Sequence, residues 1–345
     1  MIYVVWVDDI IVVASCDKMM KFGKGILKNR FKMKDLGTIS KFLGIKFTHH
    51  EDGSVSMDQK EYLESVLARF GMEECKPRST PCDLKTDAFY TDDQTIVDEP
   101  GYRAIVGSLI YAMTCTRPDL SWIVTKLSQH LSRPTEGDWT LLKQVMRYVK
   151  GTVDQKLHFT KCTEEMELVG YSDADWASSV EDRRSTTGYY FQLNSNGPAI
   201  SWKSRKQQTV ALSTCEAEYM AMSETSQEAI YLERVFRDIT SACESNEKST
   251  VQLYGDNQGS LDLVKNPVKH NKSKHIDIRY HFIRDLCTSN AIKLTHVGSD
   301  DNIADIMTKP LPRCKFDKFH EAIFGKEIDS RYLLKILFCD NCLES

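Results

Sequence analysis

Four acidic residues stand where strand and helix ends could direct their carboxylates to one point: Asp173, Glu218, Asp256 and Asp305. Asp173 follows the apolar run 168–172 and Asp256 follows the run 251–255, so each is expected at the carboxyl end of a short buried strand. Open sheets carry their chemistry at such ends. Because hard carboxylate oxygens suit Mg²⁺ or Mn²⁺, the pattern favours a divalent-metal nuclease.

The sequence around Glu218 indicates different roles for two nearby glutamates, Glu216 and Glu218. Residues 213–216 match a capping box, in which Ser213 and Glu216 would satisfy each other's free backbone N–H groups at the start of a helix. Glu218 lies two residues later, about 200° around that helix, so it cannot share the capping role. This makes Glu218 the better metal candidate, while Asp305 is expected at a loop-to-helix junction within 301–305.

Each of these residues also has an ordinary interpretation. An isolated Asp after a strand caps a helix or a turn more often than it binds a metal, and a lone helical Glu is usually solvated. The combination carries more weight than any member.

The bulk composition bounds the class of protein. A chain of 345 residues has room for roughly two domains, and its 41% hydrophobic and 27% charged residues are those of a globular protein. The net charge of −4 gives no global attraction to nucleic acid, so binding would rest on local basic clusters, although such runs are usually solvated faces. The candidate nucleic-acid contacts are Lys203, Arg205, Lys206, Lys272, Lys274, His275 and Arg279.

The two ends of the chain and its cysteines indicate an intracellular setting. The apolar N-terminal stretch is interrupted by Asp8 and Asp9 and has no basic residues before it, so neither a signal peptide nor a membrane span is expected. Eleven cysteines without a secretory signal favour reduced thiols. Cys339 and Cys342 have the C-x-x-C spacing of one half of a zinc site, but no second such pair lies near them, so they are interpreted as two incidental thiols.

Local patterns predict the elements. Two short strands within 2–14 join through Asp8 and Asp9, and a polar, proline-bearing linker is expected at 75–100. Helices are expected at 17–28, 59–70, 102–113, 119–131 with Asp119 as N-cap, and 139–149, and a hairpin at 42–49 and 54–58. From Leu168 the order becomes strand, strand, strand, helix, strand, helix, strand, which predicts a mixed α/β domain.

Four blocks of sequence carry a family resemblance: 171–177 (YSDADWA), 213–219 (STCEAEY), 255–258 (GDNQ) and 304–311 (ADIMTKPL). In this order and spacing they resemble the RNase H domain of copia-type retrotransposon polyproteins. Blocks 183–188, 201–204 and 274–284 resemble other parts of that domain, and blocks 102–109, 116–119 and 147–152 resemble the region that precedes it. Residues 7–10, 34–37 and 42–45 resemble the end of a reverse transcriptase palm. The resemblance covers nearly the whole chain to about residue 325.

The resemblance divides the chain into a truncated reverse transcriptase palm/thumb remnant at 1–82, a linker and helical connection at 83–162, an RNase H domain at 163–312 and a C-terminal tail at 313–345. Two departures bear on the remnant. Trp6 stands where the family usually has Tyr or Phe, and the fingers and the earlier palm strand that supplies another aspartate are missing. Asp8 and Asp9 are therefore not expected to form a polymerase site alone.

The resemblance also implies an activity. The expected fold is a five-stranded mixed sheet, its first three strands antiparallel, with helices on both faces. The four acidic residues named first would hold two Mg²⁺ ions about 4 Å apart, with Mn²⁺ as a substitute, to cleave the RNA strand of an RNA/DNA hybrid. His296, at the end of a strand, could assist water or product phosphate, with an ordinary strand-end histidine as the alternative.

The expected partners are the hybrid and the remainder of a Pol polyprotein, with no membrane and no small-molecule cofactor. The expected location is the cytoplasm, inside a virus-like particle if the element is active, with the nucleus as an alternative. Two other functions stay open: an element-derived fragment that binds nucleic acid or protein without cutting, and part of a polymerase completed by another chain. A hybrid cleavage assay separates the first, and primer extension tests the second.

Overall fold

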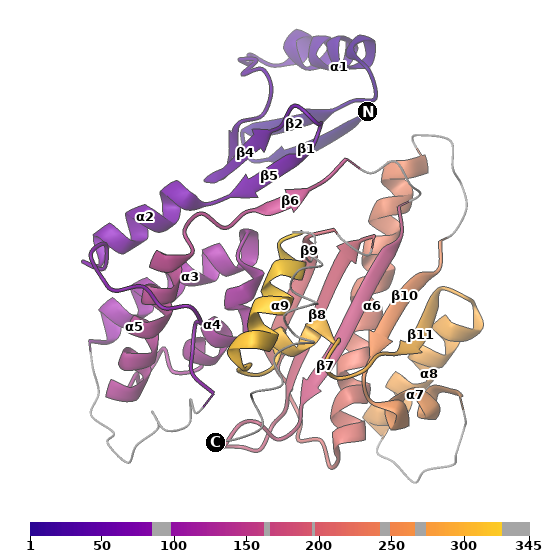
Figure 1. Ribbon diagram of the computed structural model, residues 1–345. Helices are drawn as coiled ribbons and strands as arrows, with labels where there is room; N and C mark the ends of the chain where they lie inside the picture. The colour runs from indigo at the N-terminus through magenta and orange to yellow at the C-terminus, as the bar shows by residue number, and fades with distance from the viewer. Residues whose placement is uncertain (85–97, 162–165, 195–196, 242–248, 266–273, 326–345) are drawn as a thin grey trace, which may run out of the picture.

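A five-stranded mixed sheet in the order β11-β10-β7-β8-β9 forms the centre of the C-terminal half of the chain (Figure 1). The structure is a computed structural model that describes residues 1–84, 98–161, 166–194, 197–241, 249–265 and 274–325. Strands β7, β8 and β9 are antiparallel, and β10 runs parallel to both β7 and β11. The mixed sheet with three leading antiparallel strands confirms the expected fold class. The strand bounds are β7 Leu168–Asp175, β8 Thr186–Leu193, β9 Ala199–Lys206, β10 Val251–Gly255 and β11 Ile292–His296.

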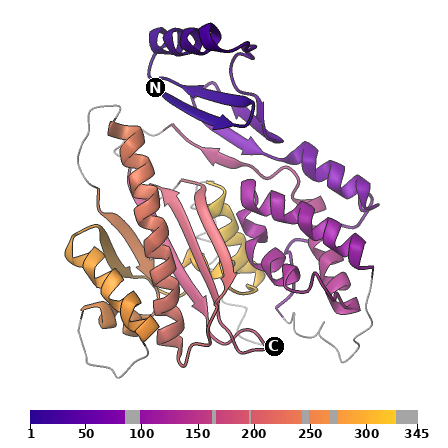
Figure 2. The ribbon, with the colours of Figure 1, turned by 180° about the vertical axis from the view of Figure 1, so that it is seen from behind.

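The sheet is covered on both faces, which explains why β8 is apolar along most of its length. Tyr190 and Phe191 are both fully buried, yet they belong to different cores because successive strand side chains point to opposite faces. Phe191 lies beneath helix α6, which Figure 2 shows crossing the sheet. The helices on the α6 face are α6 Thr214–Ser241, α7 Gln258–Lys265 and α8 Lys274–Thr288.

The other face of the sheet packs against the 3₁₀ turn η3 and against helices that precede the sheet in the chain. Tyr190 shares a core there with residues of the helical middle segment and of helix α9. The elements of this face are α3 Glu99–Cys115, η2 Pro118–Leu120, α4 Ser121–Ser128, α5 Glu136–Gly151, η3 Ile303–Met307 and α9 Arg313–Ile323. Helix α9 begins the segment expected as a C-terminal tail, and it buries Phe316, Phe319 and Ile323.

The predicted capping role of Asp119 is wrong. Asp119 is buried within η2, and α4 begins only at Ser121 without a side-chain cap. Its carboxylate instead accepts hydrogen bonds from the buried Arg117 guanidinium at 3.0 and 2.7 Å and from the Tyr148 hydroxyl at 2.5 Å. Arg117 holds the pKa of Asp119 below its usual value, although burial alone would raise that pKa. An ion pair can persist in the core in this way because its remaining hydrogen-bonding groups are satisfied.

The described N-terminal part comprises the β1–β2 hairpin, helices α1 and α2, and a separate four-stranded sheet in the order β3-β4-β5-β6. The last strand of this sheet, β6, follows α5 in the chain. It joins the sheet by pairing with β5, with Leu157 opposite Met57. The hairpin carries exposed apolar side chains, including Val5 and Trp6. The bounds are β1 Ile2–Trp6, β2 Asp9–Val13, α1 Asp17–Arg30, β3 Lys41–Phe42, β4 Ile45–His49, β5 Val55–Asp58, α2 Lys60–Arg69 and β6 Leu157–Phe159.

Two further expectations concern membranes and the C-terminal thiols. Within the described ranges, no helix has the length and apolar character needed to cross a bilayer. Cys339 and Cys342 lie outside the described residues.

Candidate metal centre

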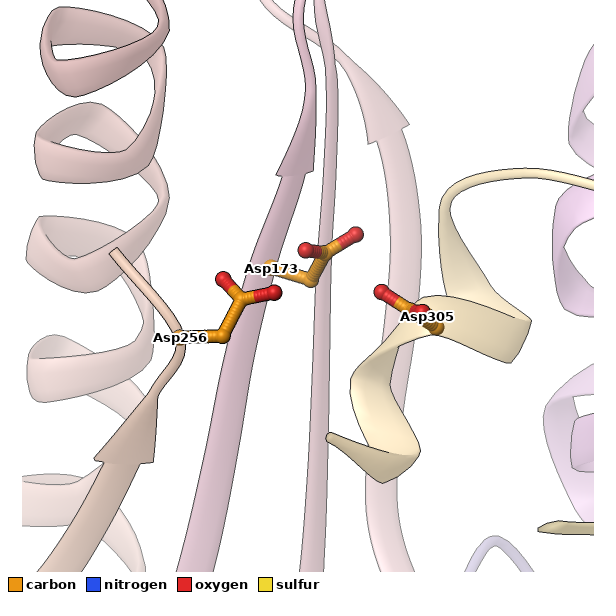
Figure 3. A group of neighbouring side chains, drawn as sticks. All are labelled: Asp173, Asp256 and Asp305. Carbon is orange, nitrogen blue, oxygen red and sulfur yellow. The ribbon is translucent and has the colours of Figure 1, made fainter. Parts of the chain in front are cut away.

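The parallel pairing of β7 and β10 brings the first two aspartates together. Gly255 is the register partner of Ser172, so the residues that follow them, Asp256 and Asp173, lie side by side. Asp256 follows the last residue of β10, as expected, whereas Asp173 lies inside β7, two residues before its end. Figure 3 shows the carboxylate of Asp173 between those of Asp256 and Asp305. One carboxylate oxygen from each of the three residues lies within 4.8 Å of the others.

Asp305 reaches the cluster from η3, at the junction expected for it. Asn302 fixes this turn in two ways: its side-chain oxygen accepts the Ala304 N–H at 3.3 Å, and its amide nitrogen donates to the Ser172 carbonyl at 3.0 Å. The second bond ties η3 to β7 next to Asp173. Asp305 is fully buried, so its position is set by the fold and not by solvent.

Glu218 completes the acidic group from the first turns of α6. It is 9% exposed, and its carboxylate accepts the backbone N–H of Ala174, the residue after Asp173. Burial raises the pKa of Glu218 well above its usual value, and the nearby charges of Asp173 and Asp256 raise it further. Glu218 therefore lies near Asp173 and Asp256, beside the group of three carboxylates that converge within 4.8 Å.

Glu216 has the structural role that the sequence predicts. Its backbone N–H donates to the Ser213 hydroxyl at 3.2 Å, and its carboxylate accepts the N–H of Leu212 at 2.9 Å. The reciprocal bond thus goes to the residue before the expected N-cap. Glu216 is therefore hydrogen-bonded at the start of α6, whereas Glu218 lies beside the aspartates.

The ionised carboxylates of the acidic group repel one another. Burial raises the pKa of Asp173 to about 7, and the charges of Asp305 and Asp256 act in the same direction against Lys309 and a hydrogen bond from Thr308. Crowded buried carboxylates of this kind need protons or cations for compensation. The oxygen-only donor set and its convergence therefore fit a hard divalent cation such as Mg²⁺ or Mn²⁺.

Two lysines beside the acidic group were not identified from the sequence. The Lys309 ammonium lies 2.7 Å from Asp305 Oδ1 and 3.7 Å from Asp173 Oδ2, and the Lys315 ammonium lies 2.7 Å from Asp305 Oδ2. The spacing of four residues between Asp305 and Lys309 was a usable local signal for the first contact. The second depends on the docking of α9, which no local pattern reveals.

His296 stands at the end of β11, in register with Gly255. Its Nε2 is 3.1 Å from the carbonyl oxygen of Asp256, to which it can donate, and the side chain is exposed. His296 therefore contacts the backbone of Asp256, and not its carboxylate. A role in catalysis stays a prediction.

The candidate basic contacts divide between two faces of the sheet. Lys203 and Arg205 line one pocket of about 310 Å³ on the α6 face together with Arg279. Lys206 points to the other face, where it pairs with Asp182 at 3.0 Å, because neighbouring strand residues alternate. Two glutamates of α6 also line the pocket, and the carboxylate of one, Glu224, lies 3.9 Å from the Arg205 guanidinium. The net positive charge of the pocket is therefore small. Lys272 and the side chains of Lys274 and His275 lie outside the described part.

Asp8 lies in the β1–β2 turn in the N-terminal part of the chain, and Asp9 is the first residue of β2. Both are exposed, and Asp9 pairs with Trp6 in the hairpin register. They are separate from the cluster built by the C-terminal sheet.

Comparisons with known proteins agree with this organisation. Residues 1–84 match the family described as reverse transcriptase (RNA-dependent DNA polymerase). The chain is 38% identical over 329 residues to a retrovirus-related Pol polyprotein from transposon TNT 1-94 of Nicotiana tabacum, covering 93% of this chain and 24% of that protein. It is 30% identical over 225 residues to a putative transposon Ty5-1 protein of Saccharomyces cerevisiae, covering 65% of this chain and 72% of that protein.

A solved structure similar to this one is the N-terminal RNase H domain of Rv2228c from Mycobacterium tuberculosis, at 12% identity and a TM-score of 0.31, covering 46% of this chain and 98% of that one. The chain spans about a quarter of the TNT 1-94 polyprotein. The identities across most of the chain and the N-terminal family match lead to one conclusion: this chain belongs to the family of copia-type retrotransposon Pol polyproteins.

Proposed function

We propose that the C-terminal sheet domain is a ribonuclease H that cleaves the RNA strand of RNA/DNA hybrids in a reaction dependent on Mg²⁺ or Mn²⁺. The observation that carries the proposal is the convergence of Asp173, Asp256 and Asp305 within 4.8 Å. Glu218 adds a fourth carboxylate from α6. Membership of the Pol polyprotein family supports a nucleic-acid substrate.

The four carboxylates would hold the divalent ions. When bound, such ions supply a more acidic water and stabilise charge on the leaving oxygen of a phosphodiester. The protein's own contribution is to fix the carboxylates in place before substrate arrives. Thr308 donates to Asp173, Asn302 locks η3 onto β7, and the N–H of Ala174 holds Glu218.

Substrate selection would rest on backbone features. An RNA strand is distinguished from DNA by its 2′-hydroxyl groups, so binding should be largely independent of base sequence. We propose Lys203 and Arg205 as contacts to the phosphate backbone, supported by their shared pocket with Arg279. Replacing both Lys203 and Arg205 by Met should therefore weaken hybrid binding and make its salt dependence shallower.

The test of the proposed function compares substrates of one sequence. The full chain is incubated with Mg²⁺ and an RNA/DNA hybrid, the same RNA alone, or the matching DNA duplex, each labelled on one strand. We expect cleavage of the RNA in the hybrid, with 5′-phosphate and 3′-hydroxyl products, and none of the DNA duplex. Equal cleavage of the free RNA, or no cleavage of the hybrid, would contradict the proposal.

A further inference from the structure

Lys309 places a positive charge among the carboxylates that would bind metal. Its ammonium is 2.7 Å from Asp305 and 3.7 Å from Asp173, and its side chain is 34% exposed. The backbone holds the residue on the same turn, because the Lys309 N–H donates to the Asp305 carbonyl at 3.2 Å. Although burial alone would lower it, the pKa of Lys309 is raised by Asp173 and Asp305, so the ammonium stays charged.

Lys315 contacts Asp305 from a different side. It approaches the other carboxylate oxygen at 2.7 Å from helix α9 and also donates to the Ser299 carbonyl at 2.6 Å. The two ammonium groups therefore divide Asp305 between them. Of these two lysines, only Lys309 is also an ion-pair partner of Asp173, another of the three converging carboxylates.

We propose that Lys309 is an internal counter-cation of the acidic cluster, which a divalent ion displaces when it binds. The inference rests on the metal site of the proposed function. A metal ion and the ammonium would use the same carboxylates, because the Asp173 and Asp305 side chains that bracket the ammonium are those that converge with Asp256. Without metal, the ammonium reduces the repulsion within the buried cluster. Metal affinity then reflects an exchange of one cation for another.

This exchange predicts opposite effects of Lys309→Met on two measurements. The variant loses its counter-charge, so the metal-free protein should unfold at a lower temperature than the wild type in EDTA. The same change removes a competing cation, so the affinity for Mn²⁺, titrated by calorimetry, should rise at least about tenfold. Lys309→Arg keeps the charge and should lie near the wild type in both measurements.

Lys318 offers a matched control on α9. Its side chain is 32% exposed and pairs with Asp301 at 2.6 Å, an ion pair outside the cluster. Lys318→Met should therefore lower the unfolding temperature without raising Mn²⁺ affinity. An increase in affinity equal to that of Lys309→Met would show that general charge removal explains the effect, and the proposal would fall.

A second control separates this inference from the metal site itself. Asp256→Asn removes one ligand and should abolish the strong Mn²⁺ binding seen with the wild type. If Asp256→Asn loses binding while Lys309→Met gains none, the counter-cation role is refuted and the metal site stands. If Asp256→Asn and the wild type bind Mn²⁺ equally, the metal site is wrong and the counter-cation role falls with it.

Discussion

Asp173→Asn should abolish activity and at the same time stabilise the metal-free protein. The substitution keeps the shape of the side chain and removes a charge that is 1% exposed. Burial raises the pKa of Asp173 from 3.8 to about 7, chiefly by desolvation. Each pKa unit corresponds to about 1.4 kcal/mol, so ionising this carboxyl costs the metal-free fold up to about 4 kcal/mol above pH 7.

The pH dependence follows from the direction of that shift. Because the folded-state pKa of Asp173 is raised, the protonated carboxyl favours the folded state at low pH, and this stability is lost as pH rises from about 4 through about 7. Asparagine does not titrate, so the variant escapes the loss. Its advantage over the wild type should be largest near pH 8 and should shrink toward pH 4.

The assay is urea unfolding in EDTA at several pH values, alongside hybrid cleavage in Mg²⁺. We expect Asp173→Asn to gain at least about 1 kcal/mol of unfolding free energy at pH 8 and to cleave at least about a hundredfold more slowly. Asp262→Asn, at an exposed position on α7, serves as the matched control and should change neither. A variant that is less stable than the wild type at pH 8, or that keeps its activity, would refute the account of the cluster.

Three other predictions concern Glu218, the N-terminal aspartates and His130. Glu218→Gln should abolish metal-dependent cleavage, whereas Glu216→Gln should keep most of the activity and lose about 1 kcal/mol or less of stability; the reverse ranking would move the ligand to the capping residue. The chain should show no primer extension, and the Asp8→Ala, Asp9→Ala double variant should cleave within about twofold of the wild type, about 0.4 kcal/mol, because these exposed carboxylates lie apart from the cluster. The pKa of His130 is raised, mainly by its hydrogen bond to Asp138, so the stability that this histidine contributes should be complete below about pH 6.5 and should fade as pH rises further. Urea unfolding of His130→Gln and of the wild type at pH 6 and pH 9 checks this, and an equal loss of unfolding free energy at both pH values would contradict it.

The sequence predicted the acidic cluster because its signals are local. A carboxylate after an apolar run marked the end of β10 correctly for Asp256, and the parallel pairing of Ser172 with Gly255 brings Asp173 beside it, although β7 continues to Asp175. The assignment of Glu218 over Glu216 needed only helix geometry. The mixed sheet with three leading antiparallel strands came from the family resemblance, and the order of the strands was not predicted, since the strand pattern alone does not choose partners.

Other features depend on contacts between distant residues. Asp119 was expected to cap a helix, because an Asp after proline before an apolar run fits a cap; its real partners, Arg117 and Tyr148, meet it only in the folded core. Strand β6 is three residues long and pairs with β5 about a hundred positions earlier, so no pattern marks it. By contrast, strand alternation alone predicts that Lys206 points to the opposite face of the sheet from Lys203 and Arg205.

The most direct test of the central claim is a single-turnover measurement on a hybrid with a 5′-labelled RNA strand, using wild type and Asp256→Asn purified in the same way. Mg²⁺ is varied from none to excess over EDTA. We predict RNA cleavage by the wild type that rises with Mg²⁺, and a loss of at least about a hundredfold in the variant at every concentration. Equal cleavage by the two proteins, or wild-type cleavage that persists in EDTA, would contradict a metal-dependent nuclease site at this cluster.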